Sequence, residues 1–468
     1  MALEAAIMLF FRVMKFGAVA LLGLTATGAQ AQSLTSALAY AYENNPEIAS
    51  SFIAVRSARQ DVIEAGGAHL PTIGAQLSIN QTFTNAPETT GPGGVPMGGT
   101  SSTTSDSIGL NYQQNLWDNF ASDAAMLAAQ AAYEAQAFSA ANTEQTVLLN
   151  AATSYFNVLR DRRLVQIAEE NLGFVQAQLQ SARDRLELGE GTELDVAQAQ
   201  AAVAQATAAY QAARSSLLSS EASYQLNVGR EPGALSSGFV TANMPSSIDS
   251  ALAAARTGHP ALLAAQAQVR ASAHQADQID ASFGPQLSLS ANAGVSGFTG
   301  DDGVTQQAQI GLNLSVPIYT PSRDPSVERA NLARISSELQ SLSTYNTLEE
   351  AIRSGWAGVQ TATAQIEATT AAVAASRLAL EAVIEQNELG QATTLDVLDA
   401  RADLLAAEEQ LVQAQAQRAL ASYSLLSATG RMTATQMGLP VQPRTVEGDV
   451  IVPVTTAPVQ ADAWSGLR

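Results

Sequence analysis

The sequence contains no cysteine, a single lysine (Lys15) and few aromatic residues, which make up 5% of its 468 residues. The absence of cysteine excludes disulfides, thiolate metal sites and a lipid-modified N-terminal cysteine. Positive charge is also scarce, since the net charge is −20 and the isoelectric point is about 4.5. No basic patch is available to follow a phosphate backbone, so we expect no nucleic-acid partner.

The sequence also lacks the patterns of a catalytic site. Its three histidines, His69, His259 and His274, are isolated and do not have the spacing of metal ligands. Gly189 and Gly191 are not part of a complete nucleotide-binding loop, and no G-x-S-x-G motif occurs. We therefore expect no enzyme activity, no metal and no cofactor.

The first 31 residues have the pattern of a secretory signal peptide. Positive charges precede an apolar core at residues 16–25, and Ala29-Gln30-Ala31 forms an A-x-A cleavage site. Met14 is a possible true start. A membrane anchor is the alternative, but the apolar core is short for a span, and no later stretch reaches about 18 apolar residues. We expect cleavage before Gln32 and export of the mature chain.

The rest of the chain is an internal duplication. Pro46 and Pro71, each in a similar local sequence, return 214 residues later as Pro260 and Pro285. A repeat of this length is a unit of domain size and not a short solenoid repeat. The predicted division is a signal peptide at 1–31, a first structural repeat at 32–235, a second at 236–432, and an extended or disordered periplasmic tail at 433–468.

Each repeat is expected to contain a helix, two strands, a long helix and a returning helix. Ala, Gln, Ser and Leu dominate the helical segments, which favours close helix packing. At 1.5 Å per residue the long helices span about 100 Å and the others about 50–55 Å, so two short helices laid end to end match one long helix. The expected helices cover residues 34–66, 122–188 and 192–228 in the first repeat and 248–282, 326–389 and 393–429 in the second.

Alternating apolar and polar residues predict two strands in each repeat, as in Ile73, Ala75 and Leu77. We expect strands of about 10–12 residues, the length of a tilted membrane-spanning strand, with a long outward loop at residues 85–105. A soluble sandwich would alternate in the same way, but the export signal and the long loop favour a membrane barrel. Four strands cannot close a barrel, because the smallest have about eight, so we expect an obligate oligomer.

Two similar segments lie between the long and returning helices, at residues 188–196 and 389–397. In each, glycine permits the chain to reverse and a threonine, Thr192 or Thr393, is placed to cap the next helix. Each segment is therefore expected to form the tip of a helical hairpin.

Together with residues 111–118 (NYQQNLWD), the second tip segment, residues 389–400, gives the chain its resemblance to the TolC family of outer-membrane channel proteins. The resemblance implies an α+β membrane protein. Three chains, each with four strands, would form a twelve-stranded outer-membrane β-barrel, continued by a long periplasmic α-helical barrel of coiled-coil hairpins. It implies the exit duct of a tripartite efflux pump or type I secretion system in a Gram-negative cell, which conducts its cargo passively. The cargo, drugs or secreted protein, stays open.

The resemblance also implies partners: a homotrimer, outer-membrane lipid, a periplasmic adaptor (membrane fusion) protein and, through it, an inner-membrane transporter of the ABC or RND type. The adaptor would contact the hairpin tips. The expected contact residues are Leu188, Gly189, Thr192, Leu389, Gly390 and Thr393.

Family members line a periplasmic constriction with aspartates, which places Asp396, Asp399 and Asp195 at this position. Asp396 and Asp399 are three residues apart and share a helix face, so three chains would gather their carboxylates in a ring that attracts cations. The alternative is helix capping, since Thr192 with Asp195 and Thr393 with Asp396 have capping-box spacing. Capping does not account for Asp399.

The chain departs from the family at its gate, which in well-described members is held shut by a tyrosine and an arginine near the second tip. Here the matching residues are Asn387 and Ala392, and Gln198 stands where a second aspartate would parallel Asp399. Arg183 and Arg185 are candidates for a replacement contact, with solvated helix charges as the alternative.

Two other functions are weighed against the duct. A periplasmic adaptor would need β-rich domains and usually one hairpin, whereas this sequence predicts two hairpins and four strands. A structural helical protein of the cell envelope would have the helices but would conduct no ions.

Overall fold

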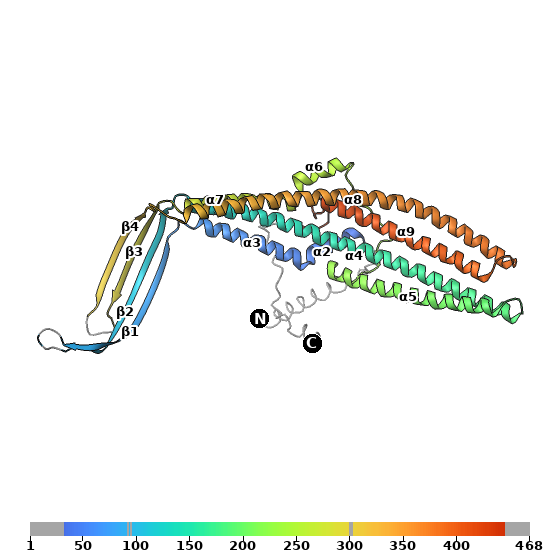
Figure 1. The fold of residues 1–468 in the computed structure, drawn as a ribbon, viewed down its shortest axis with the longest axis horizontal. Helices are drawn as coiled ribbons and strands as arrows, with labels where there is room; N and C mark the ends of the chain where they lie inside the picture. The colour runs from blue at the N-terminus through green and yellow to red at the C-terminus, as the bar shows by residue number, and fades with distance from the viewer. Residues whose placement is uncertain (1–31, 91–92, 94–95, 299–302, 445–468) are drawn as a thin grey trace, which may run out of the picture.

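The computed structural model describes residues 32–90, 93, 96–298 and 303–444. The predicted signal peptide and residues 445–468 of the predicted tail lie outside this part of the chain. The molecule is elongated, with a sheet at one end and two helical hairpin tips at the other (Figure 1). None of the helices in the described ranges combines the length and apolar character of a transmembrane helix.

The two repeats contain the same elements in the same order. The first contains α2 (Leu34–Asn44), α3 (Pro46–Gly66), β1 (Thr72–Thr90), β2 (Pro96–Trp117), α4 (Ala121–Glu187) and α5 (Glu193–Val228). The second contains α6 (Ile248–Gly258), α7 (Pro260–Ala281), β3 (Gln286–Ser296), β4 (Thr305–Ser315), α8 (Arg323–Glu388) and α9 (Thr394–Ala428).

The first helix of each repeat is broken, so the prediction of continuous helices over 34–66 and 248–282 is wrong. The breaks fall at Asn45 and His259, each directly before a proline. A proline disfavours helical backbone in the residue before it, and both residues are extended. Each then caps the helix that the proline begins, because Asn45 Oδ1 and His259 Nδ1 accept backbone N–H groups at 2.8 and 3.1 Å. Burial lowers the pKa of His259, which keeps this nitrogen available as an acceptor.

The four strands form one antiparallel sheet in the order β1-β2-β3-β4. Its register aligns apolar residues across all four strands on one face and polar residues on the other, which confirms the predicted alternation. One apolar row consists of Ile73, Tyr112, Ala291 and Ile310, and the adjacent polar row consists of Gly74, Asn111, Asn292 and Gln309. Ile73 and Ile310 are largely exposed in the single chain, so the apolar face is available to lipid.

The first hairpin is much longer than expected, and the loop predicted at residues 85–105 is wrong. β1 and β2 have 19 and 22 residues, and their pairing continues from Asn85–Thr100 to Thr90–Pro96. The threonines in this segment favour extended backbone. β3 and β4 have 11 residues each. Where β3 ends, the carboxylate of Asp106 accepts the Phe298 N–H at 2.6 Å, and further out β2 pairs only with β1.

The main hydrophobic core lies midway along the helices, where α2 packs on α4 beside α5 and α9. Its largest buried side chains include Tyr155, Phe156, Tyr224 and Leu38. We call this region the equatorial core. A separate small cluster joins α6 to α8 and α9, and α6 stands at the margin of the helical layer (Figure 1).

Residues 433–444 pack against the equatorial core, so the tail predicted from residue 433 does not begin there. Ala434 and Leu439 are buried in the core, and the Ala434 N–H donates to the Glu144 carboxylate at 2.6 Å. Further on, the backbone N–H of Arg444 donates to the Tyr42 hydroxyl at 2.8 Å. Apolar side chains and satisfied backbone groups hold this segment in place, although its Pro- and Thr-rich composition is typical of a loose tail.

Candidate functional site

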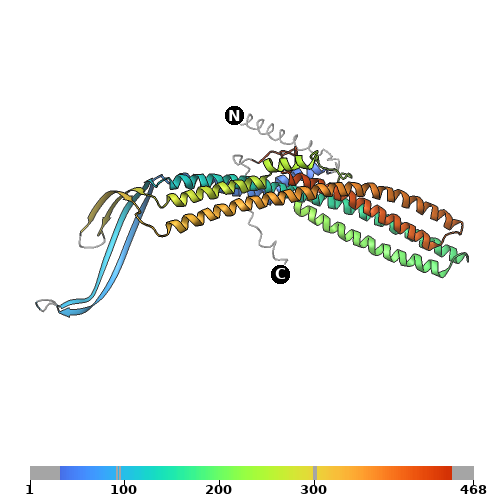
Figure 2. The same ribbon diagram turned by 45° about the horizontal axis from the view of Figure 1, so that its top comes forward.

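The two hairpin tips lie together at the end of the molecule opposite the sheet (Figures 1 and 2). In each, a glycine with left-handed backbone reverses the chain: φ is 80° at Gly189 and 72° at Gly390. At the first tip two successive N–H groups donate to the Arg185 carbonyl at 2.8 and 3.0 Å, and at the second two donate to Gln386 at 2.8 and 3.3 Å. Leu188 and Leu389 extend outward and are 75% and 73% exposed.

A reciprocal capping box begins the returning helix at each tip. The Thr192 hydroxyl accepts the Asp195 N–H at 3.2 Å, and Asp195 Oδ2 accepts both the Thr192 N–H at 3.1 Å and its hydroxyl at 2.6 Å. Thr393 and Asp396 repeat this arrangement, with distances of 3.2, 2.7 and 2.7 Å. Both pairs therefore satisfy the free N–H groups at a helix start, as the capping alternative predicted.

These hydrogen bonds act on the ionised form of each aspartate. The Thr192 hydroxyl is the largest cause that lowers the pKa of Asp195, and the Thr394 hydroxyl and Arg185 lower it further. The pKa of Asp396 is lowered by Thr393, first through the hydroxyl and then through the backbone. Both side chains are thus held as carboxylates, each with one oxygen used in a cap.

Asp399 differs from the other two predicted carboxylates. It is exposed, and in the described part of the chain no hydrogen bond or ion pair engages it. It lines a groove of about 410 Å³ between α5 and α9, above α4, together with Gln198, Asn171 and Arg401. Gln198, its counterpart in the first repeat, therefore faces the same space.

A polar contact links the two hairpins just above their tips. The Arg185 guanidinium on α4 donates to Asn387 Oδ1 on α8 at 3.0 Å, and Asn387 Nδ2 donates to the Ala392 carbonyl at 2.8 Å. Of the two candidate arginines, Arg185 is therefore the one in contact with the second hairpin. The contact therefore involves Asn387 and Ala392, the two residues that the resemblance matches to the gate residues.

The sequence did not reveal a second link between the hairpins. Arg401 on α9 donates to Asn171 Oδ1 on α4 at 3.0 Å and lies over the Phe174 ring, 5.2 Å from its centroid. Nearby, a small core formed by Leu380, Val397 and Leu404 packs α8 against α9. Asn171 and Arg401 are 230 residues apart, and neither belongs to a motif that could have identified it.

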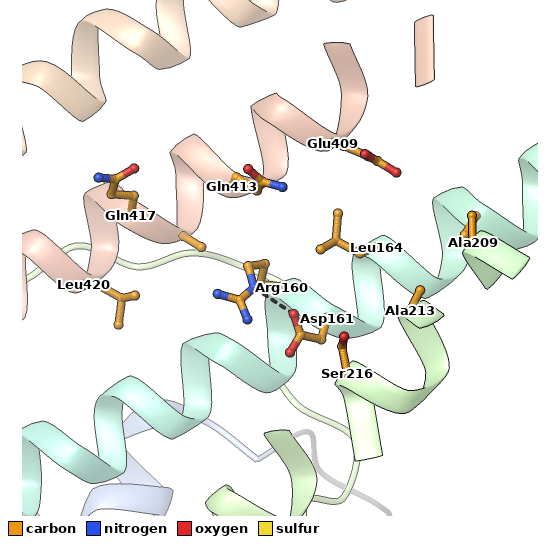
Figure 3. A pocket seen from close by; sticks show the side chains of 12 residues that line it. Arg160, Asp161, Leu164, Ala209, Ala213, Ser216, Glu409, Gln413, Gln417 and Leu420 are labelled. Carbon is orange, nitrogen blue, oxygen red and sulfur yellow. Dashed lines mark hydrogen bonds and ion pairs between the residues drawn. The ribbon is translucent and has the colours of Figure 1, made fainter. Parts of the chain in front are cut away.

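A larger cavity of about 590 Å³ lies farther from the tips, again between α5 and α9 (Figure 3). Arg160 and Asp161 on α4 form an ion pair of 2.7 Å in its wall, and Ser220 donates to the second oxygen of Asp161. Glu409 lines the opposite side, and burial raises its pKa. The groove between α5 and α9 therefore carries carboxylates at both levels.

The predicted site residues are gathered at one end of the molecule. The adaptor-contact candidates lie on the two adjacent tips, and Asp195 is close enough to the second tip to interact with Thr394. Asp399 lies one helical turn beyond Asp396, in the groove. In the described chain, no cluster of three or more His, Asp or Glu side chains with metal-binding geometry occurs.

Comparison with known proteins gives consistent matches over most of the chain. A profile of the outer membrane efflux protein family matches residues 37–229 and 251–431. The outer membrane efflux protein BepC of Brucella suis biovar 1 is 35% identical over 454 residues, covering 95% of this chain and 94% of BepC. The outer membrane protein TolC of Escherichia coli is 26% identical over 433 residues, covering 88% of this chain and 86% of that protein.

A solved structure has the same architecture. The Campylobacter jejuni CmeC outer membrane channel matches with a TM-score of 0.74 at 17% sequence identity, covering 85% of each chain. This likeness confirms the predicted fold class for the single chain, a four-stranded sheet continued by long helical hairpins in a duplicated arrangement.

Proposed function

This chain belongs to the outer membrane efflux protein family, and we propose that its two hairpin tips form the periplasmic mouth of a trimeric channel, where Asp399 supplies the exposed carboxylates. The observation that carries the proposal is the placement of both tips, with Asp399 beside them, at the end opposite a sheet with an apolar outer face.

Family membership confirms the function and location expected from the sequence: an outer-membrane exit duct of the efflux type whose helical part extends into the periplasm. Channels of this family are trimeric and work with periplasmic adaptors and inner-membrane transporters. The same finding disfavours the two alternatives, a periplasmic adaptor and a structural helical protein.

Trimerisation of this chain is supported by the sheet. β1 and β4 are its two edges and are not paired with each other, which in lipid would leave backbone groups unsatisfied at several kcal/mol each. α8 also exposes a row of apolar side chains that a neighbouring chain would cover. They are Leu332, Ile335, Leu339 and Leu342. Mass measurement of the protein in detergent tests this point, and a stable monomer would contradict it.

Contact with an adaptor at the tips is supported by the exposure of Leu188 and Leu389, since large apolar side chains at a protruding turn are suited to bind a partner. Replacing both with aspartate should abolish adaptor capture while the trimer persists. The matched control replaces both with methionine, which keeps the apolar surface, and should retain capture. Normal adaptor capture by the aspartate variant would show that Leu188 and Leu389 do not contribute to the interface.

The duct itself is tested by ion conductance in planar bilayers, because a duct conducts and a scaffold does not.

The cargo is tested by deleting the gene and scoring both drug sensitivity and the loss of secreted proteins. Loss of drug resistance alone assigns the channel to efflux, whereas loss of secretion assigns it to a type I system.

A further inference from the structure

Gln32, the residue that follows the predicted cleavage site, is half-buried beside the equatorial core. We use the term Gln32 pocket for the residues that contact it, which are Tyr155, Tyr224 and residues 233–236. Its backbone N–H donates to the Ala234 carbonyl at 2.6 Å, and its carbonyl accepts the Ser236 N–H at 3.1 Å. These bonds form a parallel bridge between Gln32 and Leu235. The Tyr155 hydroxyl on α4 donates to the same Gln32 carbonyl at 3.0 Å.

The side chain of Gln32 is held as well as its backbone. The Tyr224 hydroxyl on α5 donates to Gln32 Oε1 at 3.1 Å. A Cβ at Gly233 would lie 3.0 Å from Gln32 Nε2, so the absence of a side chain at Gly233 makes room for the carboxamide. Tyr155 and Tyr224 are buried, and burial raises the pKa of both hydroxyls, which therefore remain protonated donors.

The wall of this pocket is fixed by its own contacts. The Arg162 guanidinium donates to the carbonyls of Gly233 and Pro232 at 2.6 and 2.9 Å, and it forms an ion pair with Glu221 at 2.9 Å. The equivalent of Gln32 in the second repeat, 214 residues later, is Ser246, which is exposed. The pocket is therefore a feature of the first repeat and does not follow from the duplication.

An N-terminal glutamine is chemically unstable. Its free α-amine can attack Cδ of its own carboxamide, so that an α-N–Cδ bond forms and the Cδ–Nε2 bond breaks. Ammonia leaves with a proton from the amine, and the product is a pyroglutamate ring. The reaction needs no oxidant, reductant or cofactor, but it needs the amine and the carboxamide free to approach each other.

We propose that this pocket binds the chain's own new N-terminus and keeps Gln32 in its open, uncyclised form. In the structure, where Gln32 is still joined to Ala31, its backbone N–H donates to the Ala234 carbonyl and its carboxamide accepts from the Tyr224 hydroxyl. Cleavage would turn this nitrogen into the α-amine, which keeps protons to donate to the same carbonyl. Cyclisation requires both groups to be released, and each hydrogen bond to be broken should slow it roughly fivefold to tenfold. The proposal rests on cleavage before Gln32 but not on conductance, the adaptor or the cargo.

The test is mass spectrometry of the N-terminal peptide of the purified mature protein in detergent, followed over time. We expect Gln32 at the N-terminus, open in the folded protein and converted at least tenfold faster after unfolding in denaturant. Tyr224→Phe, which removes only the hydroxyl, should speed conversion roughly fivefold to tenfold in the folded state. Tyr210→Phe changes a half-buried tyrosine on the same helix that does not contact Gln32; it is the matched control and should leave the rate unchanged.

Three outcomes would overturn the proposal: an N-terminus other than Gln32, a folded protein that cyclises as fast as the unfolded chain, or equal rates in Tyr224→Phe and Tyr210→Phe. The comparison of folded with unfolded wild-type protein needs no variant, so the proposal stays testable if Tyr224→Phe does not fold. Since the readout is a peptide mass, a failure of the proposed channel function would be seen separately in the bilayer measurement.

Discussion

The two repeats have the same local structure but different surroundings. Leu38 and Leu252 occupy equivalent positions, 214 residues apart, on the short helices α2 and α6. Leu38 is fully buried in the equatorial core, whereas Leu252 is 8% exposed and belongs to the small cluster at the margin. The helices are similar because both begin with a serine cap and end before a proline.

The difference shows which properties a duplication preserves. Caps and proline breaks depend on neighbours in sequence, so they recur in both repeats. Burial depends on what lies beside each helix in space, and only α2 has the segment at residues 433–444 beside it. The short helix of the first repeat is therefore the more deeply buried of the two, and the second repeat carries the exposed Asp399 at the tip.

The largest expected effect contrasts the two leucines directly. Leu38→Ala should lower the free energy of unfolding by about 3–5 kcal/mol, and Leu252→Ala by about 2–3 kcal/mol, because the marginal site can relax around the smaller side chain. Denaturant unfolding of the detergent-solubilised protein measures both. Equal losses would show that the two sites contribute alike to stability.

A second prediction contrasts Asp399 with Gln198 in the groove. We expect Asp396→Ala with Asp399→Ala to abolish block of the channel by polyvalent cations added on the periplasmic side, and Gln198→Asp to tighten it. One charge pair at 4 Å in water is worth about 1 kcal/mol, so tightening of about fivefold is expected. Currents in planar bilayers measure the cation block, and unchanged block in the double variant would show that Asp396 and Asp399 do not bind the blocking cations.

A third prediction concerns the link between the hairpins. Arg185→Gln removes the charge of the guanidinium that contacts Asn387, and we expect the closed channel to open about fivefold more often, since such a bond contributes about 1 kcal/mol. Arg183→Gln, an exposed neighbour, is the matched control and should not alter opening. Single-channel recording measures the opening frequency of both variants, and equal frequencies would show that residues other than Arg185 hold the channel closed.

The smallest expected effect is on the helix caps at the two tips, and loss of either cap should destabilise its helix by a similar amount. Thr192→Ala should destabilise the start of α5 by about 1 kcal/mol. The pKa of Asp195 and Asp396 is lower in the folded state, so the stabilisation by their caps is present above the unfolded pKa, about 4, and is lost as pH falls through the folded value. Hydrogen exchange at the tips, expressed as protection factors so that the intrinsic exchange rate at each pH is divided out, should show lower protection at pH 3 than at pH 6. Equal protection factors at the two pH values would contradict it.

Much of the fold could be predicted because it depends on local patterns. The alternation of Ile73 with its polar neighbours predicted the sheet faces, and the glycine and threonine of each tip predicted the hairpins. The breaks before Pro46 and Pro260 were within reach of the same reasoning, because proline restricts the residue before it. The length of β1 and β2 could not be predicted in this way, since a segment rich in Gly, Pro and Thr is compatible with a loop or a strand.

The candidate site could be predicted only in part, because only some of its contacts depend on local sequence patterns. Capping by Asp195 and Asp396 follows from a spacing of three residues, and the structure shows it directly. The contact of Arg185 with Asn387 joins residues 202 apart, so it depends on how the hairpins pack and not on either sequence. The segment at 433–444 was misjudged because composition alone does not show that a core has room for it.

Asp106 marks the level at which the sheet narrows from four strands to two, and this gives the outer rim its shape. In a trimer, three two-stranded hairpins formed by β1 and β2 would extend beyond the closed barrel. Their described side chains, at residues 79–87, 98–100 and 102–105, include serine, threonine, asparagine and glutamine but no charge. The described part of each outer hairpin would therefore offer hydroxyl and amide side chains at the exit, in contrast to the carboxylates at the opposite entrance.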